Sequence, residues 1–186
     1  MKVLSFAATN SRQSINKQLV SYATELLVER AGATISAEII DLNDFEMPIY
    51  SIDREQESGI PAQAHRFFQL IREADAIVVS FAEHNGSFSA AYKNLYDWAS
   101  RIDMRVYGDK PMVLLATSPG KGGASNVLRT AAESLPYFGA EIRGTFSLGD
   151  FYQQFDSEKG VLKDPAQRNE LVAVLDRLEK NIAVAA

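Results

Sequence analysis

Five short apolar segments alternate with segments of helical periodicity along this chain, and this alternation constrains its fold more than any other feature. The third apolar segment, Ala76–Phe81, is apolar on both faces, as is typical of an interior strand in a parallel sheet. Strands that alternate with helices predict an α/β fold with helices on both faces of the sheet. The other strands are expected at residues 3–8, 34–40, 111–117 and 140–146.

Helices are expected after each strand, and their apolar residues recur about one turn apart. The first begins near Asn16, and the later ones are expected at residues 61–73, 89–102 and 124–137 and from Pro165 onward. The apolar stripe of the last helix consists of Leu171, Val174, Leu175, Leu178 and Ile182.

Two connections are expected to lack regular structure. Residues 42–60 form a segment longer than the usual connection, which indicates a function or an interface. The polar and aromatic segment after the fifth strand, with Phe151, Tyr152 and Phe155, is predicted to be a loop.

Right-handed crossovers leave few ways to connect five parallel strands. We predict a single domain at residues 1–186 with a three-layer, flavodoxin-like fold and the strand order 2-1-3-4-5. This order brings the loops after strands one, three and four to the same edge of the sheet. These three loops are the richest in polar residues and glycine, and together they predict a ligand cleft.

The first loop, residues 9–16, holds hydroxyls, amides and one guanidinium but no acid. A helix N-terminus offers unpaired N–H donors and partial positive charge, which suit a phosphate group. Ser14 and Asn16 are both candidate helix caps. The loop lacks the glycine patterns of dinucleotide and nucleotide-hydrolysing sites. The alternative is an ordinary strand-to-helix turn. The candidate ligands are Thr9, Asn10, Ser11, Arg12, Ser14, Ile15 and Asn16.

The second and third loops carry residues that allow close approach to the backbone. Asn85 and Gly86 favour a positive φ angle, and His84 adds a flat ring. The third loop combines several glycines with a single charge, which leaves room for the edge of a planar ligand. An ordinary turn and a mobile surface connection are the alternatives. The candidates are Glu83, His84, Asn85, Gly86, Ser87, Ser118, Gly120, Lys121, Gly122 and Gly123.

Composition excludes several classes of function. A net charge of −5 gives no support to nucleic-acid binding. The absence of cysteine excludes thiolate chemistry, and two distant histidines make a metal site unexpected. No apolar run reaches membrane-spanning length, so a cytoplasmic protein is expected. A flat, monophosphorylated ligand such as FMN fits all three loops, and flavin chemistry requires no Ser–His–acid set.

Four motifs resemble those of the NADPH-dependent FMN reductase family, which includes quinone, azo-dye and chromate reductases. Residues 11–16 are similar to its phosphate loop, and residues 41–53 to its segment after strand two. Residues 83–98 resemble P-E-Y-N-G-S followed by L-K-N-x-x-D-W, and residues 117–123 resemble its third flavin loop. This chain departs from the usual pattern with Thr9-Asn10 for Gly-Ser, Ala82 for Pro and His84 for Tyr.

The resemblance implies that Ser11, Arg12, Ser14 and Asn16 hold the phosphate of FMN. The second loop would then line the isoalloxazine ring, and Ser118 with residues 120–123 would approach its pyrimidine end. It also implies an enzyme that passes hydride from NADPH or NADH to FMN and then reduces a flavin, quinone, azo compound or similar acceptor.

Homodimers or homotetramers are common in the family. Residues 42–60 and Trp98 are candidates for that contact, although a core position is the simpler interpretation of Trp98. Two alternative functions stay open at this point. One is a flavodoxin-type electron carrier, and the other is a flavin-free regulatory or scaffolding relative of the fold.

Overall fold

The sheet contains five parallel strands in the order β2-β1-β3-β4-β5, which confirms the predicted topology. A computed structural model describes residues 1–179, so the predicted stripe residue Ile182 lies outside the described residues. The third strand has the predicted bounds, and the others differ from prediction by one or two residues at an end. The strands are β1 (Lys2–Ala8), β2 (Ser36–Ile40), β3 (Ala76–Phe81), β4 (Lys110–Thr117) and β5 (Ala140–Leu148).

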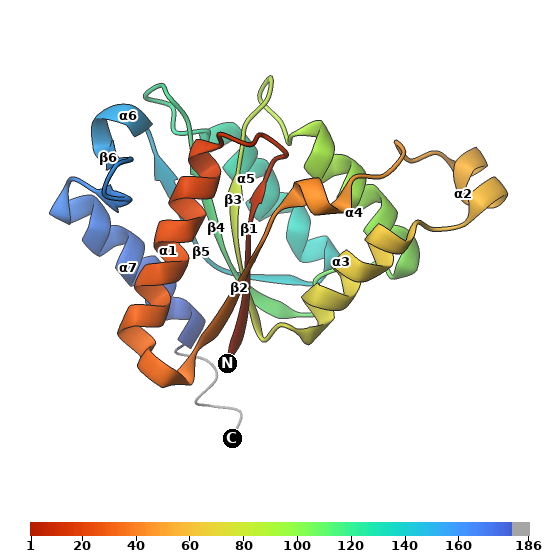
Figure 1. The fold of residues 1–186 in the computed structure, drawn as a ribbon, viewed down its shortest axis with the longest axis horizontal. Helices are drawn as coiled ribbons and strands as arrows, with labels where there is room; N and C mark the ends of the chain where they lie inside the picture. The colour runs from red at the N-terminus through yellow and green to blue at the C-terminus, as the bar shows by residue number, and fades with distance from the viewer. Residues whose placement is uncertain (180–186) are drawn as a thin grey trace.

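Helices cover both faces of the sheet, which gives the predicted three layers (Figure 1). On one face lie α1 (Ile15–Ala31) and α7 (Pro165–Glu179), whose apolar residues join Val3 and Val78 in one core cluster. On the other face lie α3 (Ala62–Glu73), α4 (Ala90–Ile102) and α5 (Ser125–Ser134). Alternate strand residues such as Leu4 and Ile77 point to that second cluster, as the twofold side-chain period of a strand requires.

The second strand begins later than predicted because α1 ends on Gly32, whose φ of 59° is in the left-handed region. Gly32 opens a short 3₁₀ turn, η1 (Gly32–Thr34), that occupies the expected start of the strand.

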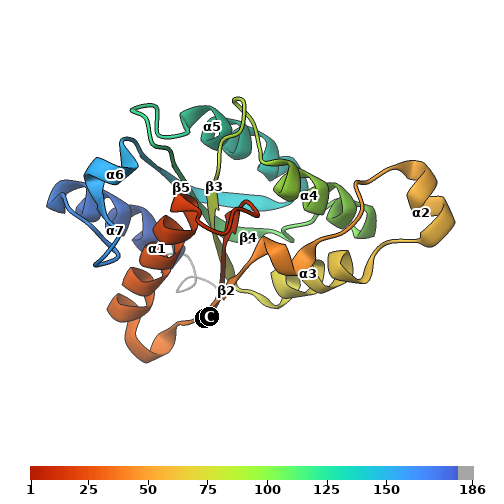
Figure 2. The ribbon, with the colours of Figure 1, turned by 45° about the horizontal axis from the view of Figure 1, so that its top comes forward.

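The connection at residues 42–60 is more regular than predicted. It contains a 3₁₀ turn, η2 (Leu42–Phe45), and a two-turn helix, α2 (Ile52–Ser58). Ser51 caps the start of α2 and Gly59 its end, but none of its residues is buried. This helix projects from the side of the molecule (Figure 2).

The segment after β5 is also structured, contrary to prediction. It forms a single helical turn, α6 (Phe151–Gln154), and an antiparallel pair, β6 (Phe155–Asp156) and β7 (Val161–Leu162). The Phe151 and Phe155 rings are buried and stack with centroids 4.8 Å apart. Both belong to the core cluster under α1 and α7.

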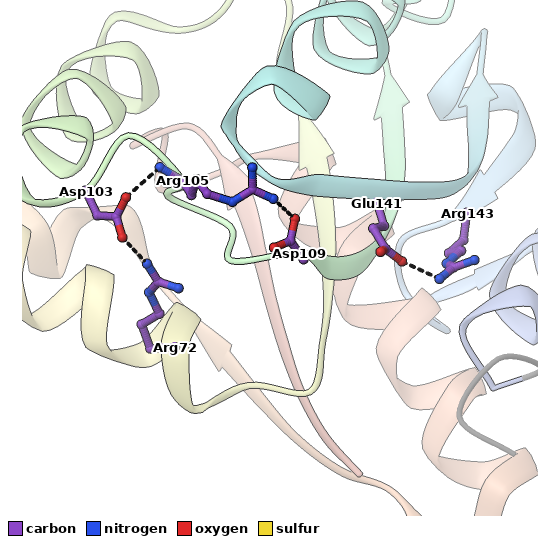
Figure 3. A network of polar contacts seen from close by, with 6 residues as sticks. All are labelled: Arg72, Asp103, Arg105, Asp109, Glu141 and Arg143. Atoms are coloured by element: carbon purple, nitrogen blue, oxygen red, sulfur yellow. Dashed lines mark hydrogen bonds and ion pairs between the residues drawn. The ribbon is translucent and has the colours of Figure 1, made fainter. Parts of the chain in front are cut away.

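Ion pairs connect elements at the amino edge of the sheet (Figure 3). Asp103 accepts a hydrogen bond from Arg72 at 2.6 Å and one from the Arg105 N–H at 2.8 Å, which ties α3 to the connection before β4. Arg105 also pairs with Asp109. Such half-exposed pairs contribute little stability each, but they fix the connections at the edge that lies away from the polar loops.

None of the helices described is both long and apolar enough to cross a membrane.

Candidate functional site

The three polar loops lie at one edge of the sheet, as predicted. They follow β1, β3 and β4, which are neighbouring parallel strands and therefore end on the same side. Figure 1 shows the three loops along the upper rim, above the strand labels. Residues 9–16, 83–87 and 118–123 are thus gathered from distant parts of the chain.

The first loop curls around a helix N-terminus. The Thr9 hydroxyl accepts a hydrogen bond from the Ser11 N–H at 3.2 Å, and Ser14 caps α1 by accepting from the Lys17 N–H. Within the described residues, the N–H groups of Ile15 and Asn16 have no protein acceptor. These donors and the dipole of α1 suit a phosphate group.

Asn16, one of the predicted phosphate ligands, directs its side chain inward. Its amide oxygen accepts hydrogen bonds from the Ser80 hydroxyl at 2.8 Å and the Thr117 N–H at 3.1 Å. Its amide nitrogen donates to the Thr117 carbonyl at 3.2 Å. The side chain of Asn16 therefore fastens α1 to the ends of β3 and β4, and only its backbone N–H remains for an anion. Its predicted role as a cap is wrong, because Ser14 is the cap.

Lys17 brings a cation to this loop that the sequence analysis missed. Its ammonium lies 2.5 Å from an Asp41 carboxylate oxygen, and both residues line a small recess with Thr9 and Ser14. The hydrogen bond from Lys17 holds the pKa of Asp41 below its usual value, helped by the N–H of Asn43 and opposed by partial burial. The signal for Lys17 was its position in the first turn of α1.

The second loop is a tight turn with the positive φ angles that its sequence predicted. His84 and Ser87 exchange two backbone hydrogen bonds, of 2.9 and 3.1 Å. Asn85 and Gly86 between them have φ angles of 52° and 75°, which are typical of a type I′ turn. All four side-chain positions are exposed.

Glu83 connects the second loop to α5 (Ser125–Ser134), the helix that follows the third loop. Its carboxylate accepts hydrogen bonds from the Val127 N–H at 2.9 Å and from the Asn126 side chain at 3.4 Å. Ala124, which precedes α5, offers no side-chain cap, so Glu83 caps this helix from another loop. The Glu83 carboxylate is thus turned toward α5.

The third loop is attached to the segment after β5 rather than being a free surface connection. The Gly120 carbonyl accepts hydrogen bonds from the Asp150 N–H and the Ser118 hydroxyl, each at 3.0 Å. A Cβ atom on Gly123 would lie 2.3 Å from the Ser147 hydroxyl oxygen, so this position requires glycine. Gly120 and Gly122 face open space, which leaves room for a planar ligand.

Gly149, which directly follows β5, must also be glycine because it packs against the third loop, and the sequence analysis missed it. A Cβ atom there would lie 2.5 Å from the Lys121 carbonyl oxygen. The contact joins segments far apart in the sequence, so no local pattern signals it.

A cavity of about 300 Å³ lies beside the first and second loops. Asn10 and His84 line it together with the connection after β2 and the start of α4. That connection is held in place by the buried Trp98, whose Nε1–H donates to the Pro48 carbonyl at 2.8 Å. Asn94 binds the same carbonyl at 3.1 Å and accepts from the Tyr50 N–H at 2.8 Å. Trp98 is therefore a core residue that shapes the cavity.

The donor set at this edge fits FMN. Free N–H groups, the exposed Ser11 hydroxyl and the Arg12 guanidinium suit its phosphate, while the open glycines suit its flat ring. The fold and this site define a flavodoxin-like protein that binds a phosphorylated cofactor.

A sequence model of the NADPH-dependent FMN reductase family matches residues 1–153, and the chain belongs to that family. An NADPH:quinone oxidoreductase of Arabidopsis thaliana is 31% identical over 183 residues, covering 96% of this chain and 90% of its own. A quinone reductase of Escherichia coli strain K12 is 27% identical over 132 residues, which is 70% of each chain.

The fold also has solved counterparts. A flavoenzyme described as an NAD(P)H:acceptor oxidoreductase, from Paracoccus denitrificans, superposes with a TM-score of 0.71 at 22% identity. The match covers 96% of this chain and 97% of that one. The predicted family, the flavodoxin-like fold, the FMN cofactor and the NAD(P)H-dependent oxidoreductase activity are confirmed. Nothing favours the electron-carrier alternative.

Proposed function

We propose that this protein reduces a small planar acceptor, a quinone or a free flavin, with electrons that NAD(P)H delivers to bound FMN. Bound FMN would supply the chemistry of hydride uptake from NAD(P)H and of two-electron transfer to the acceptor. The observation that carries the proposal is the convergence of three loops with free donors, open glycines and a cavity of about 300 Å³ on one sheet edge. The names of the Arabidopsis and Escherichia coli relatives support a quinone.

The chain's own residues bind and orient the cofactor. Arg12 and the hydroxyls of Ser11 and Ser14, with the N–H groups at the start of α1, hold the phosphate dianion. The turn at His84–Ser87 and the cavity beside it place the ring and the acceptor. Residues 118–122 hold the pyrimidine end by backbone groups, because Gly120 and Gly122 bring no side chains between backbone and ligand.

We further propose that the protein forms a homodimer or homotetramer in the cytoplasm. The connection at residues 42–60 exposes Ile49 and Ile52, with 74% and 52% of their surfaces accessible. Isolated exposed isoleucines are common, but these two lie on a projecting segment that also lines the cavity through Ile49. A second copy that covers this segment would also border the site.

A spectroscopic test decides between the enzyme and the carrier. The purified protein should be yellow, and NADPH or NADH should bleach it under anaerobic conditions. Added quinone should restore the colour. A yellow protein that resists both nicotinamides, yet accepts electrons from a redox protein, would contradict the proposal and favour an electron carrier. A protein that takes up no FMN would contradict both.

A further inference from the structure

His84 is distinctive among the residues that line the 300 Å³ cavity. Most of them are apolar or carry a neutral amide, and the Ser89 hydroxyl donates to the Ala8 carbonyl. Glu46, on the connection after β2, is the other acidic or basic residue there. Histidine commonly carries an exchangeable proton between pH 5 and 8. His84 is therefore the lining residue suited to donate a proton near neutrality.

The turn that carries His84 is rigid enough to aim a side chain. Two backbone hydrogen bonds close it, between His84 and Ser87. The next residue, Phe88, packs its ring against Phe81 and Tyr92, with centroids 5.5 and 5.2 Å away. Glu83 fixes the other end of the turn to α5. The imidazole thus projects from an anchored loop, as a group that acts on a bound ligand requires.

The charges around His84 favour a neutral ligand over an anion. Glu46 on the connection after β2 lines the same cavity, and Asp44, two residues earlier, is exposed on that connection. On its own loop, Glu83 is turned to α5. The first loop contributes the exposed Arg12. In α4, the first residues that line the cavity are uncharged. The Lys93 ammonium of that helix is bound to Asp97 at 2.6 Å.

We propose that His84 donates a proton to a neutral quinone bound in this cavity, an inference that rests on the proposed function. Conversion of a quinone to a hydroquinone takes two electrons and two protons. A hydride supplies both electrons and one proton, which converts one carbonyl to a hydroxyl and leaves an oxyanion in place of the other. The imidazolium of His84 protonates that oxyanion, and the neutral imidazole then takes a proton from water.

The test compares two acceptors of the reduced protein. A quinone needs a proton during reduction, whereas ferricyanide takes up electrons alone. In stopped-flow reoxidation, the ratio of the quinone rate to the ferricyanide rate should fall about 10-fold or more in His84→Phe and in His84→Gln. His65→Gln, which alters an exposed histidine of α3, is the matched control.

Ligand binding gives a second readout that needs no turnover. Hydroquinone added to the oxidised FMN-loaded protein should shift the NMR signals of the His84 imidazole and leave those of His65 unchanged. Equal slowing with both acceptors, an unchanged ratio or an unmoved His84 signal would each overturn the inference. Bleaching of the natural protein by NAD(P)H is recorded before any acceptor is added. Failure to bleach would overturn the proposed function itself.

Discussion

Two polar residues of the first loop have different surroundings although they are only four positions apart. Asn16 is buried, and its side chain makes three hydrogen bonds to β3 and β4. Arg12 is exposed and has no carboxylate partner within the described residues. We therefore expect Asn16 to act on the stability of the fold and Arg12 on the affinity for FMN.

Substitution of each residue by alanine separates these roles. Arg12→Ala should weaken FMN binding by about 1.5–3 kcal/mol, the contribution of a hydrogen bond to a charged group. Asn16→Ala should lower the free energy of unfolding by about 1–3 kcal/mol, because it leaves the buried Thr117 N–H and Ser80 hydroxyl without a partner. Flavin titration and urea unfolding of the flavin-free protein measure the two effects. An unchanged flavin dissociation constant in Arg12→Ala would remove Arg12 from the phosphate site.

The sequence identified this loop but not the direction of each side chain in it. A resemblance to a motif assigns a position to Asn16, whereas the rotamer depends on what lies below the loop. Here that is the end of β4, whose Thr117 is 101 residues away along the chain. The direction of the Lys17 side chain also depends on a distant residue, because its partner Asp41 directly follows β2.

At the scale of elements, α5 depends on a residue outside it. The helix starts after Ala124, which has a left-handed φ of 58° and no side-chain oxygen. The Glu83 carboxylate supplies the missing acceptor at the Val127 N–H and adds a negative charge at the positive end of the helix dipole. One side chain thus joins the second loop to the helix that follows the third.

Glu83→Ala should therefore destabilise the protein by about 1 kcal/mol, as the loss of a helix cap commonly does. The Val127 amide should exchange its hydrogen faster, since its acceptor is gone. Glu133→Ala, which removes an exposed carboxylate later in the same helix, is the control and should change stability by less than about 0.5 kcal/mol. Equal Val127 exchange rates in the two variants would show that Glu83 does not cap α5.

The elements that the sequence failed to predict bury no residues or are very short, so neither leaves a pattern that can be detected in the sequence. α2 buries none of its residues, so it has no apolar stripe to detect, and its only local signals are the caps Ser51 and Gly59. The pair β6–β7 is only two residues long on each side, and Phe155 at its start packs against Tyr22 of α1. In contrast, β3 was predicted because burial of both its faces makes it a continuous apolar run, and α4 because burial of one face leaves an apolar stripe.

At the scale of the whole molecule, the alternation of strands and helices predicted a parallel sheet, and the order chosen among the few possible ones, with its common edge for the three loops, is confirmed. The structure of the projecting connection at residues 42–60 could not be predicted from this alternation. Its inner side is held by Trp98 and Asn94, whereas its outer side exposes Ile49 and Ile52. Exposed apolar side chains on a projecting connection beside the site favour a contact with a second copy of the chain.

The proposed oligomer should accordingly dissociate when both isoleucines become charged. Burying one isoleucine contributes about 1.5–3 kcal/mol, and a twofold interface contains each position twice, so Ile49→Glu with Ile52→Glu should yield monomers. Tyr137→Glu is the control, because Tyr137 is 84% exposed but lies at the opposite edge of the sheet. Light scattering gives the mass of each form, and circular dichroism verifies the fold. A double variant that keeps its oligomeric mass would place the contact elsewhere. A natural protein that is monomeric would exclude the oligomer. Because Ile49 also lines the cavity, dissociation should in addition weaken quinone turnover more than the reduction of bound FMN by NAD(P)H.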